Sequence, residues 1–134
     1  MRCTGELQLT VVFATTPDDV YMSWLDSESH ALFTGKPAQI EARIGAEFSA
    51  ADGYITGTIE ELKPVTDIVM NWRTTDFPEG APDSRLALHL EDIETGTRVF
   101  LSHTGLPDDQ LEDYREGWRE HYFEPMQVFF ADEE

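Results

Sequence analysis

Two histidines are the side chains in this sequence best suited to chemistry. His103 follows Val99 and Leu101 at every second position, so the three share one face of an extended segment. An imidazole titrates near neutral pH and can donate or accept a hydrogen bond, so His103 could bind a ligand at a cavity edge. The pattern favours the alternative, a core histidine bonded to backbone or to a neighbouring hydroxyl group.

His121 lies in a predicted C-terminal helix, one turn after Gly117 and three residues before Glu124. His103 and His121 together offer only two nitrogen donors, so no metal site is expected. Gly117 costs a helix about 1 kcal/mol relative to alanine. Its missing side chain indicates either close backbone packing, which we expect, or room for a ligand.

No motif for nucleophilic or phosphate chemistry is present. The sequence lacks a Gly-x-Ser-x-Gly turn and a glycine-rich phosphate loop, and its one cysteine, Cys3, has no histidine nearby in sequence. A single cysteine also excludes an internal disulfide and a cysteine-based metal cluster. We therefore expect no enzyme activity, no catalytic residue and no cofactor. Acid–base chemistry of the cyclase type inside a cavity is the lesser alternative.

A set of aromatic and aliphatic side chains forms the candidate wall of a ligand cavity. Such residues either line a concave apolar site or fill a core, and the same residue can do both. We expect them mainly to fill the core and to leave a modest cavity. The candidates are Trp24, Phe33, Phe48, Ile59, Trp72, Leu88, Leu101, His103, Tyr114, Trp118 and Tyr122.

The elements that position these residues predict one α+β domain over residues 1–134. Apolar and polar residues alternate over 5–14, which is typical of a strand. Thr16 and Pro17 then form a helix start, and a second short helix is expected over 27–33. Further strands are expected over 36–42, 47–50, 54–62, 67–75, 84–92 and 97–104.

A long amphipathic helix is expected after Pro107, with a kink near Pro125 because proline removes one backbone hydrogen bond. One helix packed on one antiparallel sheet gives a two-layer domain. The prediction is a curved antiparallel sheet of about six to seven strands wrapped on the C-terminal helix, with two short helices after the first strand. A cavity between sheet and helix is the expected ligand site.

The charge of the chain excludes one class of partner. Its 134 residues carry 27 acids and 9 bases, a net charge of −18, which would repel a nucleic-acid backbone. Hydrophobic residues make up 40%, a globular composition. No apolar run approaches the roughly 18 residues of a membrane span, and no secretory signal follows Met1, so we expect a cytoplasmic protein without membrane contact.

The predicted C-terminal helix carries much of this charge. Ten acids and two bases lie between Pro107 and Glu134. The outer side of this helix is therefore either a solvated face or a docking face for a basic partner. Docking of that kind would weaken as salt is added.

Several short motifs, in this order and spacing, carry a resemblance to a known family. They are Gly45-Ala46-Glu47-Phe48, Asp52-Gly53-Tyr54-Ile55-Thr56-Gly57, Ile68-Val69-Met70-Asn71-Trp72-Arg73, Phe77-Pro78-Glu79-Gly80 and Gly117-Trp118-Arg119-Glu120-His121-Tyr122-Phe123. The segment 13–21 resembles the strand-to-helix entry of START-like (SRPBCC, helix-grip) domains. The whole set, over about residues 6–130, resembles the C-terminal domain of the activator of Hsp90 ATPase family.

This resemblance implies a helix-grip fold with a hydrophobic groove. In two-domain members it also implies contact with Hsp90 that stimulates its ATPase. We therefore expect a non-enzymatic domain that binds an Hsp90-type chaperone or another protein, with a role in stress response. The alternative is a domain that binds or senses a small hydrophobic ligand in the cavity between the sheet and the C-terminal helix.

Overall fold

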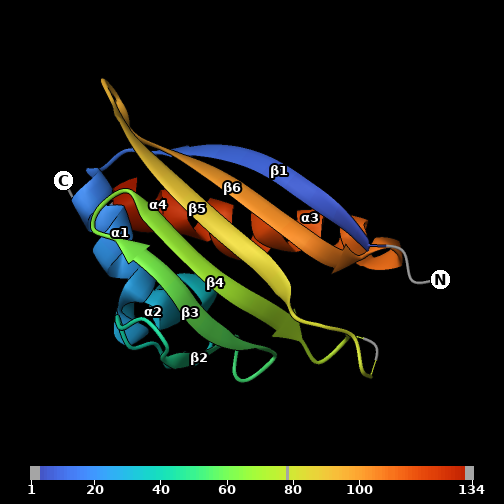
Figure 1. Cartoon of the computed structure of the whole chain (residues 1–134). Coiled ribbons are helices and arrows are strands. Elements are labelled where there is room, and N and C mark those ends of the chain that lie inside the picture. The colour runs from blue at the N-terminus through green and yellow to red at the C-terminus, as the bar shows by residue number, and fades with distance from the viewer. Residues whose placement is uncertain (1–3, 78, 132–134) are drawn as a thin grey trace.

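One curved sheet packs with its concave face against a helical stretch near the C-terminus (Figure 1). The computed structural model describes residues 4–77 and 79–131. All neighbouring strands are antiparallel, in the order β1-β6-β5-β4-β3-β2. The strands are β1 (Thr4–Phe13), β2 (Glu47–Ala50), β3 (Ile55–Lys63), β4 (Asp67–Thr74), β5 (Ser84–Ile93) and β6 (Gly96–Pro107). The predicted α+β helix-grip class is confirmed.

The alternation of apolar and polar residues fixes which face of the sheet is buried. On β5, Leu86, Leu88 and Leu90 point into the core, as predicted. On β6 the same holds for Leu101 and His103, and Leu101 pairs directly with Leu88 across the two strands. Because side chains alternate along a strand, this register directs one continuous apolar face toward the helices.

The strand predicted over 36–42 is wrong. Only Gln39 of this segment pairs with a strand, through two backbone hydrogen bonds to Ser49 of 2.8 and 2.9 Å. Pro37 has no N–H to donate to a ladder. The Ser27 hydroxyl binds both backbone groups of Ile40, at 2.8 Å from the N–H and 3.0 Å from the carbonyl oxygen. The hydroxyl of Ser27 thus occupies the backbone N–H and C=O groups of Ile40 that pairing with a neighbouring strand would need. The sheet therefore has six strands.

Two short helices follow β1, as predicted. They are α1 (Pro17–Leu25) and α2 (Ser27–Thr34), and they lie together at one end of the sheet (Figure 1). Thr16 accepts a hydrogen bond from the Asp19 N–H at the start of α1. Gly35 ends α2 with a φ of 75°, a left-handed conformation that glycine adopts without strain.

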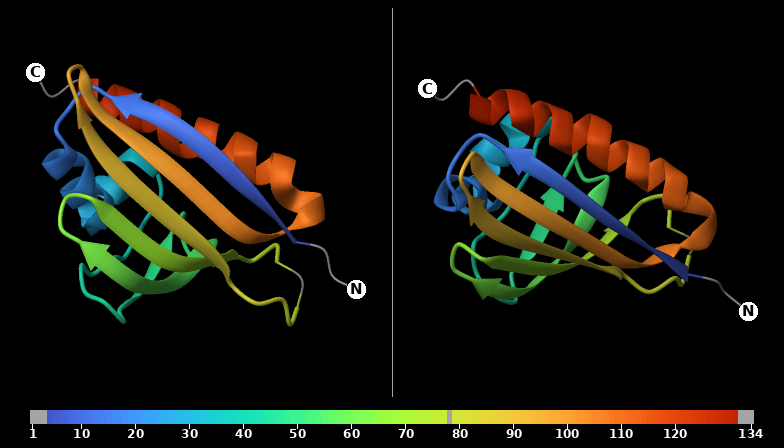
Figure 2. Two further views of the ribbon diagram at one scale, coloured as in Figure 1. Left: turned by 45° about the horizontal axis from the view of Figure 1, so that its top comes forward. Right: turned by 90° about the horizontal axis from the view of Figure 1, so that it is seen from above.

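The C-terminal stretch runs as a continuous set of helical turns along the concave side of the sheet (Figure 2). It comprises η1 (Asp108–Gln110), α3 (Leu111–Gly117), the π-helical η2 (Trp118–Phe123) and α4 (Glu124–Ala131). Pro125 has no N–H for the carbonyl of His121, and the widened π turn lies immediately before it. A π turn therefore lies next to Pro125, and the kink predicted near this residue stays a prediction.

The π turn also explains how this stretch keeps one buried face. Its buried residues recur at every fourth position, at Tyr114, Trp118, Tyr122, Met126 and Phe130. In an α-helix of 3.6 residues per turn, each such step rotates the side chain by about 40° around the axis. A wider turn in the middle offsets this drift, so all five side chains stay buried. None of the described helices is long and apolar enough to span a bilayer.

Candidate functional site

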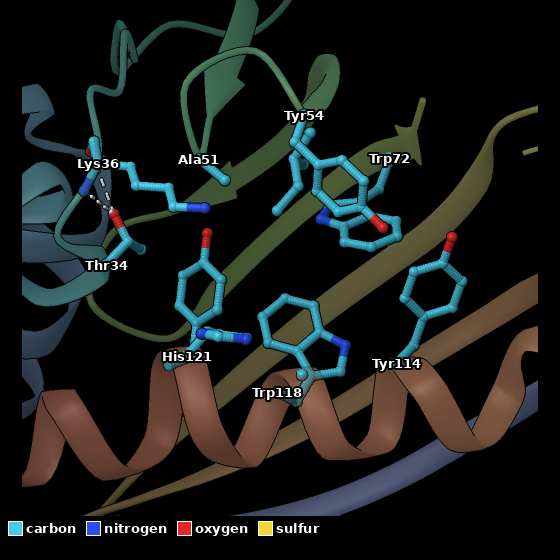
Figure 3. Close-up of a pocket in the computed structure, with 11 residues that line it drawn as sticks. Thr34, Lys36, Ala51, Tyr54, Trp72, Tyr114, Trp118 and His121 are labelled. Carbon is cyan, nitrogen blue, oxygen red and sulfur yellow. Dashed lines mark hydrogen bonds between the residues drawn. The ribbon is translucent and has the colours of Figure 1, made fainter. Parts of the chain in front are cut away.

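A cleft of about 150 Å³ opens between the C-terminal helical stretch and the β2–β3 turn (Figure 3). Residues from the end of α2, the β2–β3 turn, β3, β4 and the helix form its walls. They are Thr34, Lys36, Ala51, Tyr54, Ile55, Trp72, Tyr114, Gly117, Trp118, His121 and Tyr122. Four of the predicted cavity residues are among them: Trp72, Tyr114, Trp118 and Tyr122.

The other predicted cavity residues lie away from this cleft. Trp24, Leu88 and Leu101 border a void of only about 10 Å³ between sheet and helix, too small for a ligand. The remaining four, Phe33, Phe48, Ile59 and His103, are buried. The space directly under the helix is therefore filled by side chains, and the room for a ligand lies at its side.

His103 is completely buried, and both of its ring nitrogens are hydrogen-bonded. The Trp118 indole N–H donates to Nδ1 at 3.1 Å. Nε2 lies 2.8 Å from Ser84 Oγ, whose own proton is donated to the Trp72 carbonyl at 2.6 Å. His103 Nε2 must therefore carry the hydrogen in this bond. Burial lowers the pKa of His103 to about 3, so the ring is neutral at pH 7.

This geometry makes His103 a core residue that positions the cleft wall. In a nucleophile–base pair the serine hydroxyl donates to the imidazole. Here the donor and acceptor roles of Ser84 and His103 are reversed. His103 instead fixes the ring of Trp118, which also packs against the cleft residues Trp72 and Tyr122.

A second buried histidine, His30 on α2, fixes another wall residue. Its Nδ1–H donates to the Trp24 carbonyl at 3.0 Å, so Nε2 accepts from the Tyr122 hydroxyl at 2.7 Å. Burial lowers the pKa of His30 to about 4, although the bond to Trp24 opposes this shift, and burial raises the pKa of Tyr122. His30 is not among the site residues expected from the sequence. The available signal was its i,i+3 spacing from Phe33 on a predicted helix.

The opposite wall of the cleft is fixed by a polar network around Tyr114. Its hydroxyl donates to Gln110 Oε1 at 2.8 Å and accepts from Thr74 Oγ1 at 2.7 Å. Burial raises the pKa of the Tyr114 hydroxyl, so it stays protonated. Tyr54 donates to Asp76 Oδ2 at 2.6 Å, and the Gln110 amide binds the Asp76 carbonyl at 2.8 Å. These hydrogen bonds hold the rings of Tyr54 and Tyr114 in place.

Lys36 and His121 provide the cationic and imidazole groups of the cleft. In Figure 3 the Lys36 side chain extends over the cleft from the segment after α2, and His121 lies on the helix side. Thr34 Oγ1 donates to the Lys36 carbonyl at 3.2 Å. The Pro37 carbonyl accepts from the Asp52 N–H at 2.9 Å, which ties this segment to the β2–β3 turn.

Gly117 borders the cleft, which corrects the expectation of close backbone packing. Its φ of −61° and ψ of −43° are ordinary helical values. A Cβ atom built on Gly117 would meet no atom of another element within 4 Å. The missing side chain therefore leaves open space in the cleft.

Replacing Gly117 with alanine is expected to raise the free energy of unfolding by about 1 kcal/mol, because alanine favours the helix and nothing obstructs its methyl group. Urea unfolding at pH 7 measures this change. Gly35→Ala is the matched control, since its φ of 75° should make alanine destabilising there. A destabilised Gly117→Ala variant would contradict the open space described at this position.

No group of three or more histidine, cysteine, aspartate or glutamate residues is arranged for a metal ion in residues 4–77 and 79–131. The outer side of the C-terminal stretch is acidic instead. Its exposed acids are Asp109, Glu112, Asp113, Glu116, Glu120 and Glu124. Arg119 contacts three of them, Glu116, Glu120 and Glu124, at 3.0 to 3.9 Å. Only part of this charge is balanced on the helix itself.

A curved antiparallel sheet that grips a C-terminal helix, with an aromatic cleft beside it, defines a START-like helix-grip domain. The family described as "Activator of Hsp90 ATPase homolog 1-like protein" matches residues 14–131. The chain belongs to this family.

Known proteins similar to the chain carry related names. A human protein, "Activator of 90 kDa heat shock protein ATPase homolog 1", is 32% identical over 128 residues, which is 96% of this chain and 38% of that protein. An HSP90 activator from Plasmodium falciparum has the same fold, with a TM-score of 0.86, 20% identity and coverage of 94% of this chain and 96% of the other. An Aha1 from Colwellia psychrerythraea also has this fold, with a TM-score of 0.80 and 12% sequence identity. The match covers 97% of this chain and 99% of the other.

Proposed function

We propose that this domain binds an Hsp90-type chaperone as a non-catalytic partner. The observation that carries the proposal is the 32% identity to a human activator of the 90 kDa heat shock protein ATPase, over nearly the whole chain. The chain spans only 38% of the length of that relative. We therefore expect first that the domain binds the chaperone. If this domain alone is enough to activate the chaperone, binding also stimulates its ATPase. The cytoplasm is the compartment in which we expect the two to meet.

The polar contacts of the core support a non-catalytic role. The imidazole of His103 is neutral and shielded, and Ser84 is buried beside it with its proton bound to the Trp72 carbonyl. A cyclase-type mechanism needs an acid or base that reaches the substrate. Among the groups that line the cleft, Tyr114 and Tyr122 have pKa values raised by burial and keep their protons. His121 is the imidazole that borders the cleft, and His121→Gln tests whether any acid–base chemistry depends on it.

The test is the ATPase rate of the cognate Hsp90 with and without this protein at low ionic strength. We expect saturable binding and a higher rate. If the acidic side of the C-terminal stretch forms the contact, binding weakens between 50 and 300 mM salt, roughly the range in which the Debye length becomes shorter than 10 Å. In that case the double variant Glu116→Gln, Glu120→Gln should also weaken binding of the chaperone, because it removes two of the acids from this side. Absence of binding at low salt would contradict the proposal.

A further inference from the structure

We infer that the cleft beside the C-terminal helix binds a small aromatic carboxylate, that is, a single ring carrying one anionic group. The ring would lie against the aromatic walls and the carboxylate would pair with Lys36. This ligand site is separate from the proposed chaperone contact, so an experiment can reject either proposal and leave the other standing. Size, shape and charge of the cleft lead to this class of ligand.

The size of the cleft limits the ligand to about one ring. An apolar cavity of about 150 Å³ is large enough for benzene, and the cleft has about this volume. Drug-sized ligands need roughly 300 Å³ or more. A fused polycyclic molecule would therefore require the walls to move, and these are held by the hydrogen bonds of Tyr114, Tyr122 and Trp118.

The walls favour a planar ring over an aliphatic chain. Figure 3 shows the rings of Tyr54, Trp72, Trp118 and Tyr114 grouped on one side of the cleft. Aromatic side chains attract another ring in edge-to-face or offset arrangements beyond the effect of area alone. The polar atoms of three of these wall residues are engaged elsewhere, since Tyr54 binds Asp76, Tyr114 binds Gln110 and Trp118 binds His103. An aromatic surface is what they leave for a ligand.

Gly117 keeps the cleft open at a cost in stability. Alanine would fit there without a clash and would favour the helix, yet the chain carries glycine. The space above Gly117 is continuous with the cleft that Trp118 and His121 border on the next turn. An occupant of this space explains the glycine, whereas packing does not.

The charge of the ligand follows from Lys36. It is one of only two lysines in a chain with a net charge of −18. Among the described side chains no carboxylate forms a salt bridge with Lys36, although eight of the nine described ion pairs join an arginine to an acid. Its side chain extends over the cleft (Figure 3). A carboxylate on the ligand would supply the partner, and His121 can add an N–H donor.

The experiment titrates the protein with benzoate and follows the indole N–H signals of its three tryptophans by NMR. We expect saturable shifts for Trp72 and Trp118, and smaller ones for Trp24, which lies outside the cleft. Lys36→Met keeps most of the side chain and removes the charge, and should weaken binding about tenfold. Lys63→Met, at the other lysine, should leave it unchanged. Gly117→Leu should abolish binding by filling the cleft.

Three results would overturn the inference. Benzyl alcohol that binds as tightly as benzoate, together with an unchanged Lys36→Met variant, would show that no anion is recognised. Benzoate binding that survives in a folded Gly117→Leu variant would place the ligand elsewhere. Absence of saturable shifts at millimolar benzoate would show that the cleft binds no such ligand. Lys36 is exposed, so its variant decides the question even if Gly117→Leu fails to fold.

Discussion

Replacing Trp118 with alanine is expected to lower the free energy of unfolding by about 3–5 kcal/mol. The indole ring is buried where the helix meets the sheet, with centroid distances of 5.8 Å to Trp72 and 4.8 Å to Tyr122. Its loss removes this packing and leaves a cavity that extends the cleft. It also removes the N–H that binds His103 Nδ1. Urea unfolding monitored by far-UV circular dichroism measures the change.

Trp118→Phe separates packing from hydrogen bonding. Phenylalanine keeps an aromatic ring but leaves His103 Nδ1 without its donor, which should cost about 1–3 kcal/mol for a buried polar group. Leu111→Ala is a matched control on the same helical stretch, because Leu111 is only partly buried. A loss below about 1 kcal/mol for Trp118→Ala would contradict the central position that we assign to this ring.

The strands that alternate cleanly could be predicted from the sequence, and the segment 36–42 could not. On β5 and β6 every second side chain is apolar, and a one-residue shift would expose all of them. The segment 36–42 has apolar residues too, but the hydroxyl of Ser27 binds Ile40 from 13 positions away. A bond between residues so far apart leaves no mark in local periodicity, so tertiary structure decides the outcome there.

The candidate site was predictable in part for a similar reason. Residue type and helical spacing indicated Tyr114, Trp118 and Tyr122, since a face of one helix can be read from the sequence. The alternation of residues along the strand also indicated that His103 points inward. It did not indicate which groups form hydrogen bonds with His103. His30, Lys36 and Tyr54 reach the same region from three other segments. Only the folded chain shows that these segments meet, and that the space at Gly117 is open.

The two buried histidines, His30 and His103, should make the free energy of unfolding depend on pH. Lowering the pH from 7 to 5 should reduce the free energy of unfolding by about 4 kcal/mol through these residues alone. In the folded protein His103 and His30 have pKa values lowered by burial to about 3 and about 4, and both stay neutral. In the unfolded chain the pKa of both histidines is about 6.5. Below this pH the unfolded chain therefore binds more protons than the folded protein, which favours unfolding. Stability is complete above pH 6.5 and is lost progressively toward pH 4.

The measurement is a series of urea unfolding curves between pH 7 and 5 at constant ionic strength. His103→Gln keeps an amide donor for Ser84 but cannot titrate, and His30→Gln does the same at the second position. Each should remove about half of the pH dependence, whatever it does to the stability at pH 7. His121→Gln, which replaces an exposed histidine, is the control. If both variants keep the full slope, other groups produce the pH dependence. That outcome would contradict the titration expected here, in which a proton on the acceptor nitrogen of either ring breaks the hydrogen bond that this nitrogen accepts.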